Sequence, residues 1–307
     1  MSRFSAIFFL FISLSVTALS VHSQLGTVAN ATPEQDRAAL IQALQKRLPG
    51  TRPEDWMVGS AAYEPGVTAI PLSADNATNT ADILAIGKKQ WERKFKDGKS
   101  FSNCFPNGGK RIAASYPQFE PSTKQVVTME NALNRCLQLH GETVIALANA
   151  AEMGPLSAYA RSLSENQPLH IRVLGQNARE RFDSGRRIFN ARRGQQNFAC
   201  ASCHVQHAGG VYGTSAGAGT GTSASSTSIG APRVGGGGLA PAIGLAVSWP
   251  RLQPGGTTRS LQSQFQRCFQ RSGAEPFMSG SEEFNNLEYY LTYLSNGLPL
   301  RALATAR

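Results

Sequence analysis

The sequence predicts a mainly α-helical protein built from two tandem copies of one small helical unit. Three observations support this fold class: short motifs recur in the same order in both halves, apolar residues repeat at helical spacing, and the second half carries a compact cysteine–histidine motif. The expected divisions are a signal peptide at 1–23, an N-terminal extension at 24–78, a first unit at 79–172 and a second unit at 173–307.

The first segment reads as an export signal. Arg3 precedes an apolar run at 4–19 that ends in small residues, and a cleavage site is expected before Gln24. The run is too short for a membrane span, and no later segment is apolar enough to cross a bilayer. The mature chain is therefore expected to be exported, to a compartment that permits disulfides.

The extension contains one predicted helix. Thr32 is expected as its N-cap, with Pro33 in the first turn and Gln35 completing a capping box. The apolar stripe of this helix comprises Leu40, Leu44 and Leu48.

The internal repeat defines the two units. The matching segments are 87–91 with 185–189, 116–121 with 249–254, 133–136 with 265–268, and 159–164 with 290–295. Because the matches keep their order and nearly their spacing, they indicate two copies of one structure.

Cys200, Cys203 and His204 form a C-x-x-C-H motif, which is typical of covalent haem c attachment. The two thiols can add to the haem vinyl groups, and the histidine can bind the iron. A zinc site would need a second ligand pair at short spacing, and a thioredoxin-like pair would follow a strand in a βαβ pattern. Neither pattern is present, so the sequence predicts one covalently bound haem c and two cytochrome c-like units.

The repeat register assigns the other three of the five cysteines. Cys104 matches Cys200, and Cys136 matches Cys268. The first unit lacks the second haem cysteine and the histidine, so it is expected to carry no haem, and its two cysteines can instead form a disulfide. The same register places Cys268 near the haem on the face opposite His204, where its thiolate could be the other axial ligand.

Two helices are expected to build the haem-binding unit. The first spans about 177–192, and the second spans about 282–295 with a capping box formed by Ser279 and Glu282. Between them, residues 208–240 are dominated by Gly, Ala, Ser and Thr, so this insertion is expected to be disordered. His140 and His170 lack ligand-like spacing and are expected to be solvated.

The formal net charge is +10, with the basic residues scattered along the chain. Such an excess favours an anionic substrate or an acidic protein partner. Nucleic acid is an improbable partner for an exported haem protein without a basic run.

Three segments resemble the SoxA family, the cytochrome c subunits of the SoxAX complex of sulfur-oxidising bacteria. They are Cys-Phe-Pro-Asn-Gly-Gly at 104–109, Arg-Arg-Gly-Gln at 192–195, and Ala-Glu-Pro-Phe at 274–277 after Cys268. The resemblance runs from about 80 to 300. It implies a periplasmic heterodimer with a SoxX-like small cytochrome c. It also implies L-cysteine S-thiosulfotransferase activity, which joins thiosulfate oxidatively to a cysteine of a SoxYZ-like carrier protein.

The resemblance also implies roles for single residues. In this family the cysteine that matches Cys268 is an axial haem ligand and carries a persulfide, and members with one haem have a disulfide in place of the other haem. An arginine usually stands one helical turn before that cysteine, where this chain has Gln264. Arg267 and Arg271 are nearby substitutes, and Arg267 is the candidate for binding the substrate anion. The Gly/Ser-rich insertion has no counterpart in the family pattern.

Two alternatives remain open at this point. In a plain electron-transfer cytochrome c, Met278 would be the sixth ligand opposite His204, and Cys268 would be incidental. A binding module that only anchors the small cytochrome would leave the haem purely structural.

Overall fold

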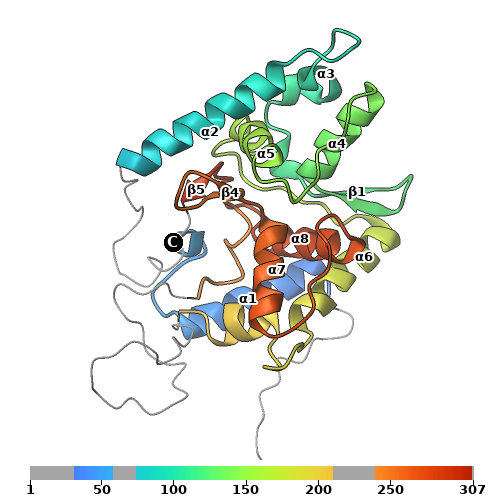
Figure 1. The fold of residues 1–307 in the computed structure, drawn as a ribbon. Helices are drawn as coiled ribbons and strands as arrows, with labels where there is room; N and C mark the ends of the chain where they lie inside the picture. Colours follow the sequence, from blue (N-terminus) through green and yellow to red (C-terminus); the bar gives the residue numbers. More distant parts are fainter. Residues whose placement is uncertain (1–30, 58–73, 210–238, 306–307) are drawn as a thin grey trace, which may run out of the picture.

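The computed structural model describes residues 31–57, 74–209 and 239–305, which are mainly helical (Figure 1). The first half of the fold contains α2 (Ala74–Glu92), α3 (Phe101–Cys104), β1 (Gln118–Glu120), β2 (Gln125–Val127), α4 (Met129–Leu139) and α5 (Met153–Ser162). The second half contains α6 (Gly175–Asn190), β3 (Arg251–Leu252), β4 (Thr258–Arg259), α7 (Leu261–Arg271), α8 (Glu282–Leu294) and β5 (Ala304–Thr305). The mainly α-helical fold class is confirmed.

The strands are short and serve as connections. β1 and β2 form an antiparallel hairpin, and the second sheet has the order β4-β3-β5. β3 pairs antiparallel with β4 and parallel with β5. β3 and β4 precede α7, and Ser260, the residue after β4, caps that helix.

The helix of the N-terminal extension is α1 (Pro33–Arg47), and its predicted cap is confirmed. Thr32 accepts a hydrogen bond from the Gln35 amide, and the Gln35 side chain accepts one from the Thr32 amide. Arg37 donates to the carbonyl oxygens of Leu294 at 3.0 Å and Asn296 at 2.7 Å. The extension is therefore fastened to the end of α8, and Figure 1 shows α1 beside the second half.

Each half has a helix pair that crosses at a glycine. A Cβ on Gly87 of α2 would lie 2.0 Å from the Pro155 carbonyl oxygen of α5. A Cβ on Gly185 of α6 would likewise lie 2.0 Å from the Asn286 carbonyl oxygen of α8. The two glycines are matched in the sequence repeat, and each lets its helix approach a partner backbone more closely than any other residue would.

Three sequence predictions need adjustment. α6 begins and ends two residues earlier than expected, and α8 is capped by Ser281, whose side chain accepts from the Phe284 amide, rather than by Ser279. The boundary expected between 78 and 79 falls inside α2. The division into two domains therefore remains a prediction, with its first boundary moved to the start of α2 or earlier.

Two other predictions lie outside the described residues. They are the signal peptide and all but the ends of the insertion at 208–240. Within the described ranges, no helix combines the length and the apolar character needed to cross a bilayer.

Candidate haem site

The haem-attachment motif lies on a short helical turn that follows α6 after the loop at 191–199. The Ser202 side chain accepts a hydrogen bond from the Ala199 amide at 3.1 Å and so caps this turn. From Ser202 to Gln206 the turn is π-helical, a conformation that is frequent at functional sites. The motif residues Cys200, Cys203 and His204 therefore lie on one continuous helical segment, 200–206.

Gly194 lets the loop before this motif lie against the end of α7. Its φ is 71°, and a Cβ here would lie 2.2 Å from the Ser272 carbonyl oxygen. The same carbonyl accepts a hydrogen bond from the Gln196 amide at 3.1 Å. This contact brings the turn that carries Cys200 to the helix that carries Cys268.

The three cysteines outside the disulfide are near one another. The pKa of Cys200 is raised to about 12, mainly by burial and then by the negative charges of Cys268 and Cys203. Burial, then Cys268, raise the pKa of Cys203. The charge of Cys268 affects the pKa of both Cys200 and Cys203. The structure therefore brings the two predicted haem-attachment cysteines and the predicted ligand into one site.

His204 is held in one tautomer. Its Nδ1 lies 2.7 Å from the carbonyl oxygen of Ala240, an oxygen that can only accept, so Nδ1 carries the proton and Nε2 is left for a metal. Burial, and to a lesser degree the charge of Arg251, lower the pKa of His204, although the bond to Ala240 opposes them. Neutral imidazole is the form that ligates iron.

Arg251 supports the fit to haem c. Burial lowers the pKa of its guanidinium to about 10, and no carboxylate offsets that burial among the described residues. Its contacts are the Ser248 side chain and carbonyl oxygen and the ring of Trp249. A buried cation without an anion suits a group that brings its own carboxylates, as haem does.

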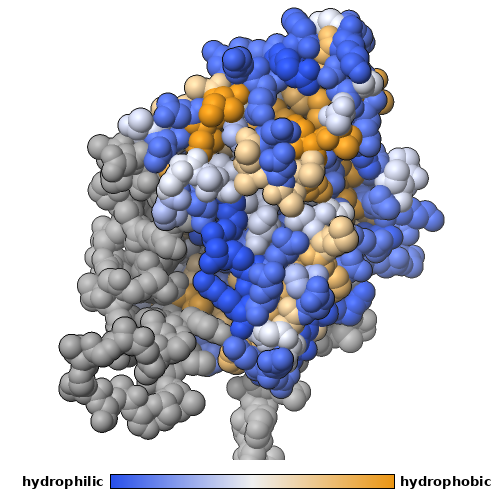
Figure 2. Space-filling view, viewed as in Figure 1, coloured by the Kyte–Doolittle hydropathy of each residue, from blue (hydrophilic) through white to orange (hydrophobic). Residues whose placement is uncertain are grey.

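Positive charge surrounds the Cys268 sulfur. Burial raises the pKa of Cys268, while a hydrogen bond from Gln264 and the charges of Arg271, Arg267 and Arg259 act to lower it. Figure 2 shows strongly hydrophilic side chains gathered on this face over β4 and α7. The mouth of the site is therefore suited to an anion.

Arg259 is the residue that the sequence did not reveal. Arg267 and Arg271 flank Cys268 in the chain, whereas Arg259 lies on β4, before the helix begins. The pKa of Arg259 is lowered by burial and then by the positive charges of Arg267 and Arg271. Within the described chain, no carboxylate acts on it. The sequence offered one indirect signal: Gln264, the residue that Arg259 contacts, is four residues before Cys268 on the same helix face.

Met278 does not reach the site. Its side chain is 78% exposed, in the loop between α7 and α8. A sixth iron ligand would have to be buried against the haem. This exposure disfavours ligation by His204 and Met278.

The first half differs at the matching positions. Cys104 and Cys136 form a disulfide, as predicted from the repeat register. The expectation that His140 is solvated is wrong, since its ring stacks on Phe95 and its Nδ1 lies 2.7 Å from an Asp97 carboxylate oxygen. The two sulfurs and a ring nitrogen of His140 all lie within 4.8 Å of one another, but the disulfide leaves no thiolate to bind a metal.

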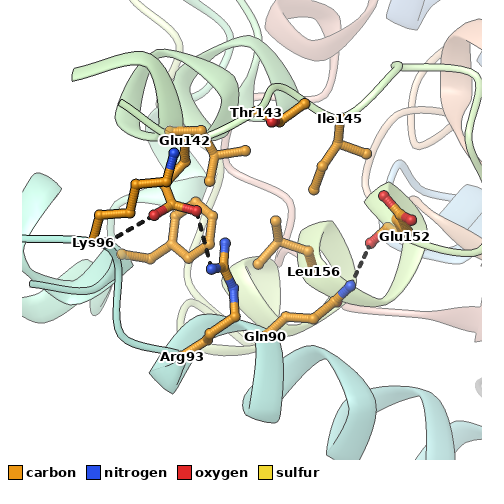
Figure 3. Close-up of a pocket in the computed structure, with 10 residues that line it drawn as sticks. Gln90, Arg93, Lys96, Glu142, Thr143, Ile145, Glu152 and Leu156 are labelled. Atoms are coloured by element: carbon orange, nitrogen blue, oxygen red, sulfur yellow. Dashed lines mark hydrogen bonds and ion pairs between the residues drawn. The ribbon is translucent and has the colours of Figure 1, made fainter. Parts of the chain in front are cut away.

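A pocket of about 360 Å³ also lies in the first half, between α2, α3, α4 and α5 (Figure 3). Arg93 donates to a Glu142 carboxylate oxygen at its rim, and the Gln90 side chain donates to the Glu152 carbonyl oxygen. Arg93 and Glu142 thus already pair with each other in this pocket. None of the candidate site residues lines this pocket.

Comparisons with known proteins agree with this arrangement. The family model for the SoxA/TsdA cytochrome c domain matches residues 86–169, the half that contains the disulfide. The chain is 30% identical over 279 residues to the L-cysteine S-thiosulfotransferase subunit SoxA of Allochromatium vinosum, covering 90% of this chain and 91% of that protein. It is 31% identical over 290 residues to the SoxA subunit of Chlorobaculum tepidum, covering 92% and 93%.

The fold is similar to that in the crystal structure of SoxXA from P. pantotrophus, with a TM-score of 0.61 and 20% identity. That match covers 76% of this chain and 80% of the other. Family membership itself follows from the 31% identity, which extends over nearly the whole length of both proteins. The chain belongs to the SoxA family of cytochromes c.

Proposed function

We propose that this chain is the haem subunit of an L-cysteine S-thiosulfotransferase and joins thiosulfate to a cysteine of a carrier protein. The observation that carries the proposal is that Cys268 lies near the haem-attachment cysteines and is acted on by the charges of three arginines. Membership of a family whose curated members bear this activity in their names supports it.

The reaction sets the requirements on the site. A carrier thiol and the terminal sulfur of thiosulfate form one S–S bond, which releases the thiol proton and two electrons. Haem c, when bound, supplies an acceptor for one electron at a time, so a second haem on a partner would take the other. The protein must hold a dianion against a reactive sulfur and shield it from water.

The residues of this chain meet these requirements in three ways. Arg259, Arg267 and Arg271 offer guanidinium donors to the sulfonate oxygens, which carry the negative charge of thiosulfate. Cys268 supplies the reacting sulfur and is the persulfide candidate. Its hydrogen bond from Gln264 stabilises the thiolate form, which is the form that attacks sulfur.

Cys200 and Cys203 would hold the haem covalently, and His204 and Cys268 would ligate its iron. Membership of a cytochrome c family implies haem c, and we propose one haem for each chain. The first half has a disulfide at the positions that match Cys200 and Cys268, and its sequence lacks a C-x-x-C-H motif.

We further propose a SoxX-like small cytochrome c as the permanent partner and a SoxYZ-like protein as the carrier of the acceptor cysteine. A periplasmic location follows from the predicted export signal and from the family. The small cytochrome would provide the second electron acceptor that the two-electron reaction needs.

A Cys268→Ser variant tests the function. With thiosulfate, the carrier protein and the small cytochrome supplied, its thiosulfate-dependent turnover is expected to fall by more than about a thousandfold, because the reacting sulfur is gone. Covalent haem, measured by intact mass, should be retained, since Cys200 and Cys203 are unchanged.

Met278→Ala is the matched control, because it removes a sulfur-containing side chain that is exposed. It should retain wild-type turnover. Loss of turnover in Met278→Ala together with wild-type turnover in Cys268→Ser would reverse the assignment and favour a plain electron carrier.

A further inference from the structure

Gln264 connects an arginine to the candidate reacting sulfur. Its side-chain nitrogen lies 3.5 Å from the Cys268 sulfur, and its side-chain oxygen lies 3.2 Å from a terminal guanidinium nitrogen of Arg259. Gln264 and Cys268 are one helical turn apart on α7, so their side chains share a face.

The chemistry of the three groups allows one orientation of the amide. A guanidinium has only N–H donors, so the carbonyl end of Gln264 must face Arg259. The NH₂ end must then face Cys268, whose sulfur as a thiolate can only accept. Reversing the amide would place donor against donor at one end and oxygen against sulfur at the other, so Arg259 decides which end of Gln264 meets the sulfur.

Arg259 is itself firmly placed. It pairs with Arg251 across the β3–β4 ladder, and the next residue, Ser260, caps α7. On its other side, the Thr258 hydroxyl donates to the Ala150 carbonyl oxygen at 3.0 Å, in the first half of the fold. Both neighbours of Arg259 in the chain are therefore fixed, which is what a residue that orients another side chain requires.

We propose that Arg259 is a positioning residue that acts on Cys268 through Gln264. Arg259 holds the Gln264 amide so that its N–H donates to the Cys268 sulfur, and this bond sets the electron density on that sulfur. The inference rests on the proposed role of Cys268 as haem ligand and reacting sulfur. It adds that a residue of β4 affects the electron density on this sulfur through a hydrogen-bonded side chain.

A route through the amide differs from a direct effect of charge. Arg267 also lies near the sulfur and lowers the pKa of Cys268, but its exposed side chain makes no contact with Gln264 among the described interactions. Arg267 therefore offers a matched comparison: it has the same charge and stands on the same helix as Gln264, but it lacks the connecting hydrogen bond.

A double-mutant cycle on the haem-loaded chain tests the proposal. Gln264→Met keeps the length of the side chain and removes both hydrogen bonds, and Arg259→Leu removes the group that orients the amide. Each variant is expected to lower the haem reduction potential, because a sulfur that accepts one hydrogen bond fewer stabilises ferric iron. In the double variant, Arg259→Leu should have a clearly smaller effect than in the wild-type background, because only its direct charge on the Cys268 sulfur is then left to lose.

Kinetics provide the second readout. Arg259→Leu and Gln264→Met should each lower kcat by about tenfold, as expected for one lost hydrogen bond to the reacting sulfur. Gln264→Met should leave KM for thiosulfate little changed, whereas Arg259→Leu should also raise it, because Arg259 is one of the three arginines proposed to bind the sulfonate. Arg267→Leu should raise KM for thiosulfate rather than lower kcat. Its effect on the haem reduction potential should be the same in the wild-type chain and in Gln264→Met. If Arg259→Leu loads haem poorly, Arg259→Met, which keeps the length of the side chain but has no N–H donor, should shift the potential in the same direction.

Additive effects of Arg259→Leu and Gln264→Met on the potential would overturn the proposal, and so would an unchanged potential in Arg259→Leu. Either result would leave the proposed function intact, provided that Cys268→Ser remains inactive. An active Cys268→Ser variant would overturn the proposed function itself, whatever the outcome of the cycle.

Discussion

At the residue scale, Arg161 is shared by two buried carboxylates. Its guanidinium lies 3.5 Å from a Glu130 oxygen and 3.7 Å from a Glu288 oxygen. Burial, then the charge of Glu130, raise the pKa of Glu288 to about 7, although Arg161 and a hydrogen bond from Gln262 act in the opposite direction. One arginine cannot compensate two buried carboxylates fully, so Glu288 retains its proton more readily when the protein is folded.

The resulting pH dependence has a definite sign. Because the folded pKa of Glu288 is above the ordinary glutamate value of 4.5, this residue stabilises the fold most below pH 4.5, and that contribution is lost as the pH rises to about 7. In urea denaturation, Glu288→Gln should gain stability relative to wild type by about 2–3 kcal/mol between pH 4.5 and 7.5.

Glu275→Gln, at an exposed position, is the control and should give a constant difference from wild type. A constant difference in Glu288→Gln as well would show that Glu288 is ionised alike in the folded and unfolded chain.

At the element scale, the helix crossings hold each half together. α6 meets α8 at Gly185, where a Cβ would lie 2.8 Å from the Tyr290 Cβ as well as 2.0 Å from the Asn286 carbonyl oxygen. Phe182 packs edge-on against Tyr290 on the same face, with ring centroids 5.1 Å apart. The helix in front of the haem motif is therefore fixed by a backbone contact that leaves no room for a side chain.

Gly185→Ala should separate these two helices. The variant is expected to lower the free energy of unfolding by at least about 1–3 kcal/mol, because the neighbouring atoms are backbone and cannot rotate away. Glu180→Ala, on the exposed side of α6, should change it by less than about 0.5 kcal/mol. Equal stability of Gly185→Ala and wild type in chemical denaturation would contradict this packing.

The elements that the sequence predicted well are those with local signals. The Thr32 cap and the apolar face of α6 around Gly185 depend on residues three or four apart in the chain. The ends of α1 and α6 could therefore be predicted to within about two residues. The cap of α8 was assigned wrongly, because Ser279 and Ser281 both precede the acidic first turn, and pattern alone does not give the backbone angles of either. Arg259 was missed because its partner Gln264 is reached through a strand-to-helix junction, which has no periodic signature.

At the scale of the whole molecule, two similar halves carry unequal chemistry. The repeat register led to the Cys104–Cys136 disulfide and to the proximity of Cys268 and Cys200, both of which are long-range features. The sequence could not show how the halves dock, because the repeat register matches positions in the two halves but does not predict contacts between them, such as that of Arg161 with Glu288. The sequence also gave no indication that His140 is partly buried beside the disulfide, apart from its spacing of four from Cys136.

The disulfide should stabilise the first half without affecting the haem. Replacing both Cys104 and Cys136 by serine opens a link across 32 residues, and chain entropy predicts a loss of about 3–4 kcal/mol in the free energy of unfolding. The visible spectrum of the haem should be unchanged, because the attachment motif is in the other half. A spectrum altered by the double replacement would indicate that the first half shapes the haem site directly.

The central claim is that the Cys268 sulfur is the axial partner of His204 at the iron. Electron paramagnetic resonance of the oxidised, haem-loaded protein tests it most directly, because thiolate and thioether ligation give different low-spin signals. We predict a thiolate-type signal in the wild type, the same signal in Met278→Ala, and its loss in Cys268→Ala with the haem still attached. A wild-type signal that persists in Cys268→Ala and changes in Met278→Ala would contradict the account.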